Sequence, residues 1–188
     1  LSTALFASLL IATAGEAREF NMSSTKSLLG FEGGYSNTYI DTTTATTSTT
    51  TKFKPYHGGI KIGGESEDYR LFLSARYYNV DGFDYITTYG GELQYKFNFS
   101  NYMNFFVGFN AGLANAKYKP ATTTVRTFSK TYYGADAGFN IHMGESVDLE
   151  FGSRVMSIAA DNLSGTTTYT FDRIVTGYGS LIFKYSMD

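Results

Sequence analysis

Residues Tyr89–Phe99 read YGGELQYKFNF, a stretch in which apolar and polar side chains alternate along the chain. The odd-numbered positions carry Tyr, Gly, Leu, Tyr, Phe and Phe, whereas the even-numbered positions carry Gly, Glu, Gln, Lys and Asn. A β-strand points successive side chains to opposite faces of its sheet. The stretch therefore predicts a strand with one apolar face and one polar face, the latter carrying Glu92 and Lys96.

Other segments with the same two-residue period complete a set of eight predicted strands: Leu28–Tyr39, Tyr56–Glu65, Tyr69–Tyr78, Met103–Ala116, Tyr133–His142, Val147–Val155 and Phe171–Tyr185. The connections between them alternate in length. The short ones are Ser66–Asp68, Ser100–Asn101 and Met143–Ser146, and the longer ones are Ile40–Lys52, Val80–Ile86, Lys117–Thr127 and Ala159–Thr170. This alternation predicts an all-β, eight-stranded antiparallel up-and-down meander, with tight turns at one end and loops at the other.

Composition excludes several classes of protein. The chain has 188 residues, enough for one domain, and 15 Lys and Arg against 17 Asp and Glu, with no basic run. Because nucleic-acid phosphates are held by clustered positive charge, nucleic acid is not an expected partner. The absence of cysteine excludes disulfides, cysteine-ligated metal centres and a thiol nucleophile. Beyond residue 14 no apolar run is long enough for a membrane-spanning helix.

The first residues have the features of an export signal. Leu1–Ala14 is an apolar stretch of the length of a signal-peptide core, and Gly15-Glu16-Ala17 places small residues where a signal peptidase cleaves. We therefore expect residues 1–17 to be the end of a signal peptide that lacks its charged start, and residues 18–188 to form the mature barrel domain. An exported chain without cysteine fits a bacterial envelope protein.

An alternating strand can belong to a soluble barrel, with its apolar face inside, or to a membrane barrel, with its apolar face toward lipid. Three features favour the membrane: strands of about 9 to 16 residues, a polar face rich in glycine and alanine, and aromatic residues at both ends of the apolar faces. The aromatic residues are Tyr69, Phe97, Phe99, Phe105 and Tyr185 at the turn end, and Tyr35, Tyr56, Tyr77, Tyr89 and Tyr133 at the loop end. The pattern predicts a transmembrane β-barrel.

From about Ser27 to Asp188 this pattern resembles the small eight-stranded outer-membrane barrels of Gram-negative bacteria, such as the OmpA transmembrane domain, OmpX and the opacity proteins. The last strand, Tyr178–Tyr185, resembles the assembly signal of such proteins, with Phe183 and Tyr185 at its alternating apolar positions. It differs in having Ser180 where glycine is usual and three residues after the final aromatic residue. The resemblance implies short periplasmic turns, extracellular loops, surroundings of outer-membrane lipid and lipopolysaccharide, and delivery by the barrel assembly machinery.

The predicted polar faces carry charges of both signs that would meet inside the barrel. These residues are Glu32, Lys61, Arg70, Arg76, Glu92, Lys96, Asp136, Asp148, Glu150, Arg154 and Lys184. Ions in a narrow interior are tolerable when they are paired. They can form either a packed plug or a gated ion path, and the small cross-section of an eight-stranded barrel favours the plug.

The sequence offers no catalytic or metal site, and neither a cofactor nor an enzymatic activity is expected. His57 and His142 fall near opposite ends of the predicted barrel, too far apart to share a metal ion. Lipid A deacylases, which are outer-membrane barrels, use a His-x-Ser pair, and neither histidine here is followed by such a serine. Ser153 and Glu150 lie on opposite faces of one predicted strand and cannot act together.

The longest predicted loop is a low-complexity threonine tract, which we expect to be mobile and to meet the environment. Its threonines are Thr42, Thr43, Thr44, Thr46, Thr47, Thr49, Thr50 and Thr51. The sequence favours a monomeric protein with a structural or surface-interaction role, with a host or environmental ligand at the loops. A narrow pore is the alternative, followed by a lipid A-modifying enzyme and a soluble lipocalin-like binder.

Overall fold

The computed structural model describes residues 25–119, 126–164 and 167–186, and these form nine β-strands. The strands are β1 (Lys26–Thr43), β2 (Ser48–Phe53), β3 (Tyr56–Glu65), β4 (Tyr69–Asn79), β5 (Phe83–Asn98), β6 (Met103–Tyr118), β7 (Arg126–His142), β8 (Val147–Ser164) and β9 (Thr167–Ser186). None of these residues belongs to a helix that could cross a membrane. The predicted signal peptide, residues 1–17, lies outside the described residues.

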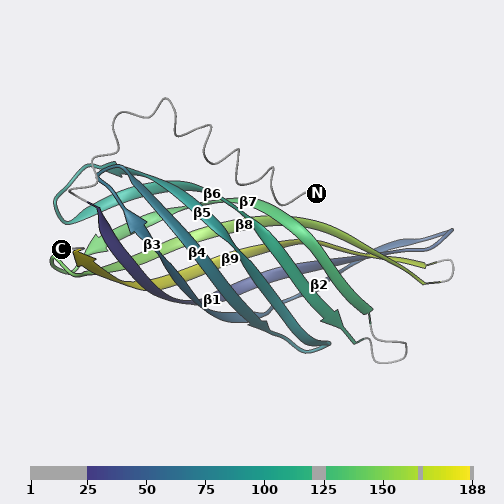
Figure 1. Ribbon diagram of the computed structural model, residues 1–188. Coiled ribbons are helices and arrows are strands. Elements are labelled where there is room, and N and C mark those ends of the chain that lie inside the picture. Colours follow the sequence, from purple (N-terminus) through teal and green to yellow (C-terminus); the bar gives the residue numbers. More distant parts are fainter. Residues whose placement is uncertain (1–24, 120–125, 165–166, 187–188) are drawn as a thin grey trace, which may run out of the picture.

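The sheet closes on itself into an eight-membered ring (Figure 1). Neighbouring strands pair antiparallel, and β1 also pairs with β9, from Lys26 opposite Ser186 onward. The strand β2 is not a ninth member of the ring. It pairs only with residues 38–43 of β1, and β3, which follows it in the chain, pairs with residues 26–35 of β1. Pro55 lies at the break between β2 and β3, where its carbonyl accepts a hydrogen bond of 2.8 Å from the Ser36 amide. The eight-stranded up-and-down topology is confirmed.

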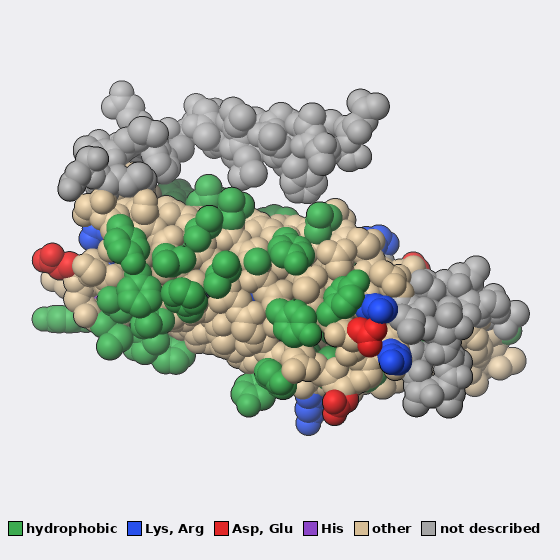
Figure 2. Space-filling model, turned by 60° about the horizontal axis from the view of Figure 1, so that its bottom comes forward, with side chains coloured by type: hydrophobic (Ala, Val, Ile, Leu, Met, Phe, Trp, Pro, Cys, Tyr) green, Lys and Arg blue, Asp and Glu red, His purple; other side chains and the backbone are tan. Residues whose placement is uncertain are grey.

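The outer surface of the ring is apolar. Large side chains such as Leu73, Phe109 and Phe139 are about half exposed along its middle, and apolar side chains cover much of the face in Figure 2. In contrast, Arg70 and Arg154 are fully buried inside. This inverted arrangement suits a barrel surrounded by lipid, where the apolar face points outward.

The short connections form one end of the ring, which we call the turn end. The Ser66 amide donates to the Tyr69 carbonyl, and the Met143 amide donates to the Val147 carbonyl, at 2.8 and 2.9 Å. Gly144 has φ of +119°, a conformation that residues with a side chain rarely adopt. These tight turns are where the sequence predicts them.

The opposite end, which we call the hairpin end, differs from the expectation of long irregular loops. The predicted loop at 40–52 is instead a hairpin, because β1 continues to Thr43 and β2 begins at Ser48, with only residues 44–47 in the turn. Its threonines have branched β-carbons, which favour extended strands once a partner is present. The segment predicted to be a loop is therefore mostly strand, with a four-residue turn at its tip.

Two of the other predicted long loops are also largely strand. The connection between β4 and β5 is only residues 80–82, while β8 and β9 extend over most of the predicted loop at 159–170. Of the predicted loop at 117–127, residues 120–125 lie outside the described residues. Figure 1 shows the β1–β2 and β8–β9 hairpins reaching farther than the rest of the sheet.

Candidate functional site

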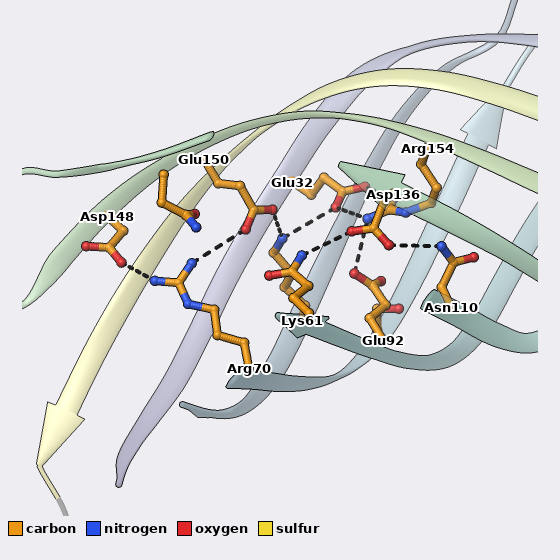
Figure 3. Close-up of polar contacts among 12 residues, drawn as sticks. Glu32, Lys61, Arg70, Glu92, Asn110, Asp136, Asp148, Glu150 and Arg154 are labelled. Carbon is orange, nitrogen blue, oxygen red and sulfur yellow. Dashed lines mark hydrogen bonds and ion pairs between the residues drawn. The ribbon is translucent and has the colours of Figure 1, made fainter. Parts of the chain in front are cut away.

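The polar faces of the eight ring strands line the interior, which brings the predicted lumen charges together. All eleven are buried: Glu32, Lys61, Arg70, Arg76, Glu92, Lys96, Asp136, Asp148, Glu150, Arg154 and Lys184. They come from β1, β3, β4, β5, β7, β8 and β9. Because strand alternation fixes which residues point inward, residues distant in sequence meet in one network, here called the lumen network (Figure 3).

The centre of the lumen network is a pair of glutamates shared by two arginines. Glu32 accepts hydrogen bonds from Arg76 Nε at 2.7 Å, from Arg154 Nη1 at 2.8 Å and from His57 Nε2 at 3.0 Å. Glu92 accepts from Arg154 Nη2 at 3.1 Å and also from Arg76. Charge-assisted hydrogen bonds of this kind hold both partners in fixed orientations.

A second group of charges lies toward the turn end. Arg70 donates to Glu65 at 2.7 Å and also to Asp148. Asp148 is in turn 2.7 Å from Lys184 Nζ and 2.8 Å from the ring nitrogen Nδ1 of His142. Glu65 is not among the predicted lumen charges, although it is in phase with Lys61 on the same strand, and this shared phase would have identified it.

Lys61 and Glu150 connect the two groups. Their side chains are 2.5 Å apart, Lys61 Nζ is also 3.7 Å from Glu32, and Arg70 is 3.7 Å from Glu150. Asp136 differs from the other carboxylates because it accepts from two amides, Gln94 at 3.2 Å and Asn110 at 3.1 Å. Apart from Asp136, the charged side chains therefore form one continuous network rather than a set of separate pairs.

The lumen network is balanced in charge. Its six carboxylates are Glu32, Glu65, Glu92, Asp136, Asp148 and Glu150, and its six cations are Lys61, Arg70, Arg76, Lys96, Arg154 and Lys184. Lys96 completes the pairing with Glu65 at 3.3 Å. Most of these charges have an ion-pair partner among the described residues, which is the condition for ions to persist in a narrow interior.

The two histidines belong to different parts of the lumen network, His57 beside Glu32 and His142 beside Asp148. Among the described residues, no cluster of three or more His, Asp and Glu side chains has the geometry of a metal site. Ser153 is exposed on the outer face, whereas Glu150 is buried in the lumen. These residues therefore do not form a Ser–Glu pair.

Toward the hairpin end, the interior is apolar instead of charged. This apolar cluster consists of Ile40, Tyr78, Ile86, Ala114, Ala116, Phe128, Tyr132, Met156, Ile158, Ala160, Phe171 and Ile174. Phe53, Phe83 and Tyr118 pack against it, with ring centroids 5.0 to 5.8 Å apart. The apolar cluster is not predicted from the sequence, because several of its members lie in segments predicted to be loops.

The remaining predicted site residues lie on the outside. In the assembly-signal strand, Phe183 is half-buried and its ring is 6.4 Å from that of Phe31, while Tyr185 is 53% exposed. In the threonine tract, Thr42 and Thr44 are half-buried, and Thr43, Thr46, Thr47, Thr49, Thr50 and Thr51 are exposed. The tract therefore presents hydroxyl groups on a hairpin.

Comparison with known proteins agrees with this architecture. The model of the outer membrane protein beta-barrel domain matches residues 2–179. Neisserial surface protein A has 16% sequence identity over 82% of this chain and 97% of its own, with a TM-score of 0.59.

The N-terminal β-barrel domain of Pseudomonas aeruginosa OprF has 12% identity over 84% of this chain and 97% of its own, with a TM-score of 0.52. The outer membrane protein OprG from the same organism has 11% identity over 88% and 99%, with a TM-score of 0.51. No curated protein matches the sequence. With the family match covering nearly all of its length, the chain belongs to the outer-membrane β-barrel family and is located in the outer membrane of Gram-negative bacteria.

Proposed function

We propose that this protein is a non-conducting barrel that presents its hairpin end at the cell surface as an interaction surface. The observation that carries the proposal is the filling of the lumen. Arg154 and Arg76 hold Glu32 and Glu92 across its centre, and the apolar cluster fills the region beyond them. An ion entering this interior would have to displace buried ion pairs and cross an apolar layer, and both steps are costly.

The extension at the hairpin end supports the interaction role. The β1–β2 and β8–β9 hairpins form one four-stranded sheet beyond the rest of the ring, in the order β2-β1-β9-β8 (Figure 1). Two threonine hydroxyls form hydrogen bonds there: Thr50 donates to Asp41 at 2.6 Å, and Thr170 donates to Asp161 at 2.7 Å. A paired hairpin loses less conformational entropy on binding than an irregular loop of the same length would.

The orientation in the membrane is tested by labelling intact cells. We would introduce single cysteines as Thr46→Cys at the hairpin tip and Met143→Cys in a turn at the opposite end, in a chain that has no cysteine of its own. A membrane-impermeant maleimide should label the first variant in intact cells and the second only after permeabilisation. The reverse pattern would overturn the proposed orientation.

The interaction role is tested by shortening the hairpin without changing its register. Asp41 pairs with Thr50, so residues 42–49 can be replaced by Asn-Gly, which forms a two-residue hairpin turn. Cells producing either form would be compared for binding to immobilised matrix proteins and sulfated glycans. The native hairpin should support binding and the shortened one should not, and equal binding or no binding by both would contradict the proposal.

A narrow pore is the second candidate, because some lumen groups need water. Tyr132 Oη, Thr88 Oγ1 and Asn110 Oδ1 are buried and have no hydrogen-bond partner among the described residues. Buried polar groups of this kind are usually satisfied by internal water, and a hydrated interior favours a path. The folded chain in a planar bilayer should show no single-channel openings if the lumen is a plug, whereas reproducible openings would establish the pore.

A further inference from the structure

Asp136 differs from the other carboxylates of the lumen network, because it forms no ion pair with any residue in the described part of the chain. Its side chain is buried, with 4% exposure, and its two oxygens accept hydrogen bonds from Asn110 Nδ2 at 3.1 Å and from Gln94 Nε2 at 3.2 Å (Figure 3). Its register partner Arg154 directs its guanidinium group to two glutamates instead. A buried carboxylate without a cation beside it is costly.

The lumen network is neutral as a whole but not in each of its regions. Around the centre, three cations face three carboxylates: Lys61, Arg76 and Arg154 with Glu32, Glu92 and Glu150. Toward the turn end, three cations face two carboxylates: Arg70, Lys96 and Lys184 with Glu65 and Asp148. The sixth carboxylate, Asp136, pairs in register with Arg154 and so belongs to the centre. The centre therefore carries one negative charge in excess, and a monovalent cation beside Asp136 would neutralise it.

The two amides that contact Asp136 each carry an oxygen without a partner. Gln94 and Asn110 are fully buried, and Gln94 Oε1 and Asn110 Oδ1 accept no hydrogen bond from the described residues. An unsatisfied buried acceptor costs free energy. Rotation of each amide group by 180° would exchange its nitrogen and oxygen and turn both oxygens toward Asp136. Two carboxylate oxygens and two amide oxygens would then converge on one point, and a cation at that point would satisfy all four.

Two glycines provide the space in which these oxygens lie. Gly108 on β6 is the register partner of both Gln94 and Asp136, and a Cβ atom there would lie 2.9 and 3.0 Å from the two Asp136 oxygens. Gly134 on β7 is the register partner of Asn110, and a Cβ atom there would lie 2.8 Å from Asn110 Oδ1. Both contacts are tighter than Cβ atoms normally make. The absence of these two side chains lets the carboxylate and the amide lie against the barrel wall.

We propose that Asp136, Asn110 and Gln94 bind a sodium ion inside the lumen. Carboxylate and carbonyl oxygens are the ligands of hard cations. The rotated amide oxygens would take the places of the present nitrogens, 3.1 and 3.2 Å from the Asp136 oxygens, a spacing at which both can contact one small ion. A calcium ion takes about six to eight oxygens and would leave one positive charge unneutralised beside Asp136. The inference does not depend on the orientation of the barrel or on its proposed surface role.

The test is urea unfolding of the folded barrel in lipid vesicles, in sodium chloride and in choline chloride of equal ionic strength. Equal ionic strength keeps the screening of charges the same, and choline is too large for the site. A ligand that binds only the folded state lowers the unfolding equilibrium constant by the factor 1 + [L]/Kd. For the native chain we expect this constant to be roughly tenfold smaller in sodium chloride, as for a ligand present at about ten times its Kd.

Two variants remove the site in different ways. Asp136→Asn keeps the shape of the side chain without its charge, and Asn110→Ala removes one ligand oxygen, so both should unfold equally in the two salts. Each protein is compared with itself, so a change in its basal stability does not enter the ratio. The control Asp84→Asn removes an exposed carboxylate outside the lumen and should keep the full sodium effect. A native chain that is insensitive to sodium, or a sodium effect that persists in Asp136→Asn, would overturn the proposal.

Discussion

The two halves of the lumen are filled by opposite chemistry. Toward the turn end, Arg70 and Arg154 are fully buried among carboxylates, with a small apolar contact of Leu28, Phe72 and Ile182 between the charges. Toward the hairpin end, the apolar cluster contains Ile174 and Phe171 at no exposure. The first half is held by directional pairs that require every partner, whereas the second is held by packing that depends on volume. The difference indicates that a substitution will have different consequences in each half.

The largest effect is expected from breaking the charged half. Arg154→Met leaves Glu32 and Glu92 buried with fewer partners, and removing one member of a buried ion pair costs about 3–5 kcal/mol. Urea unfolding in lipid vesicles, followed by the gel shift between folded and heated protein, would measure this loss. Adding Glu92→Gln should restore part of the lost stability, because it removes a buried carboxylate that has lost one of its two arginine partners. Additive losses in the double variant would contradict the pairing.

A smaller loss is expected in the apolar half. Ile174→Ala removes buried volume from the apolar cluster and should destabilise the barrel by about 2–4 kcal/mol in the same unfolding measurement. The control is Val175→Ala, one residue along on the outer face, which should cost less because its side chain contacts lipid or solvent. If both substitutions lower the free energy of unfolding equally, the hairpin half of the lumen is not a packed core and the lumen is wider than the structure shows.

The sequence predicts the charged half of the lumen but not the apolar half. Alternation placed Arg70, Glu92 and Arg154 on inward faces, because strand phase depends only on local residue order. The pairing of Glu32 with residues as distant in sequence as Arg154 depends on ring closure between β1 and β9, which no local pattern encodes. The apolar half was missed because Ile40 and Phe53 border a polar threonine tract, whose strand character appears only when β9 is beside it.

The hairpin tip should matter little to stability, although it carries the proposed interaction. Replacing residues 42–49 by Asn-Gly removes mostly exposed side chains and leaves the apolar cluster intact, so the free energy of unfolding should change by less than about 1 kcal/mol. The same variant is expected to lose binding to the immobilised ligands. A large loss of stability would show that the extension supports the barrel, and loss of binding could not then be assigned to a contact surface.

The smallest effect on stability is expected for Lys117→Gln. This substitution removes an exposed ion pair and can be compared with Arg154→Met, which removes buried ones. The Lys117–Asp84 distance of 2.8 Å is as short as the distances inside the lumen network, but the Lys117 side chain is 38% exposed. Water can solvate Asp84 once its partner is removed, whereas Glu32 and Glu92 have no such access. The unfolding midpoint of Lys117→Gln should therefore equal that of the native chain, while that of Arg154→Met falls. A comparable fall in both variants would mean that distance rather than burial governs these pairs, and the contrast between the lumen and its rim would not hold.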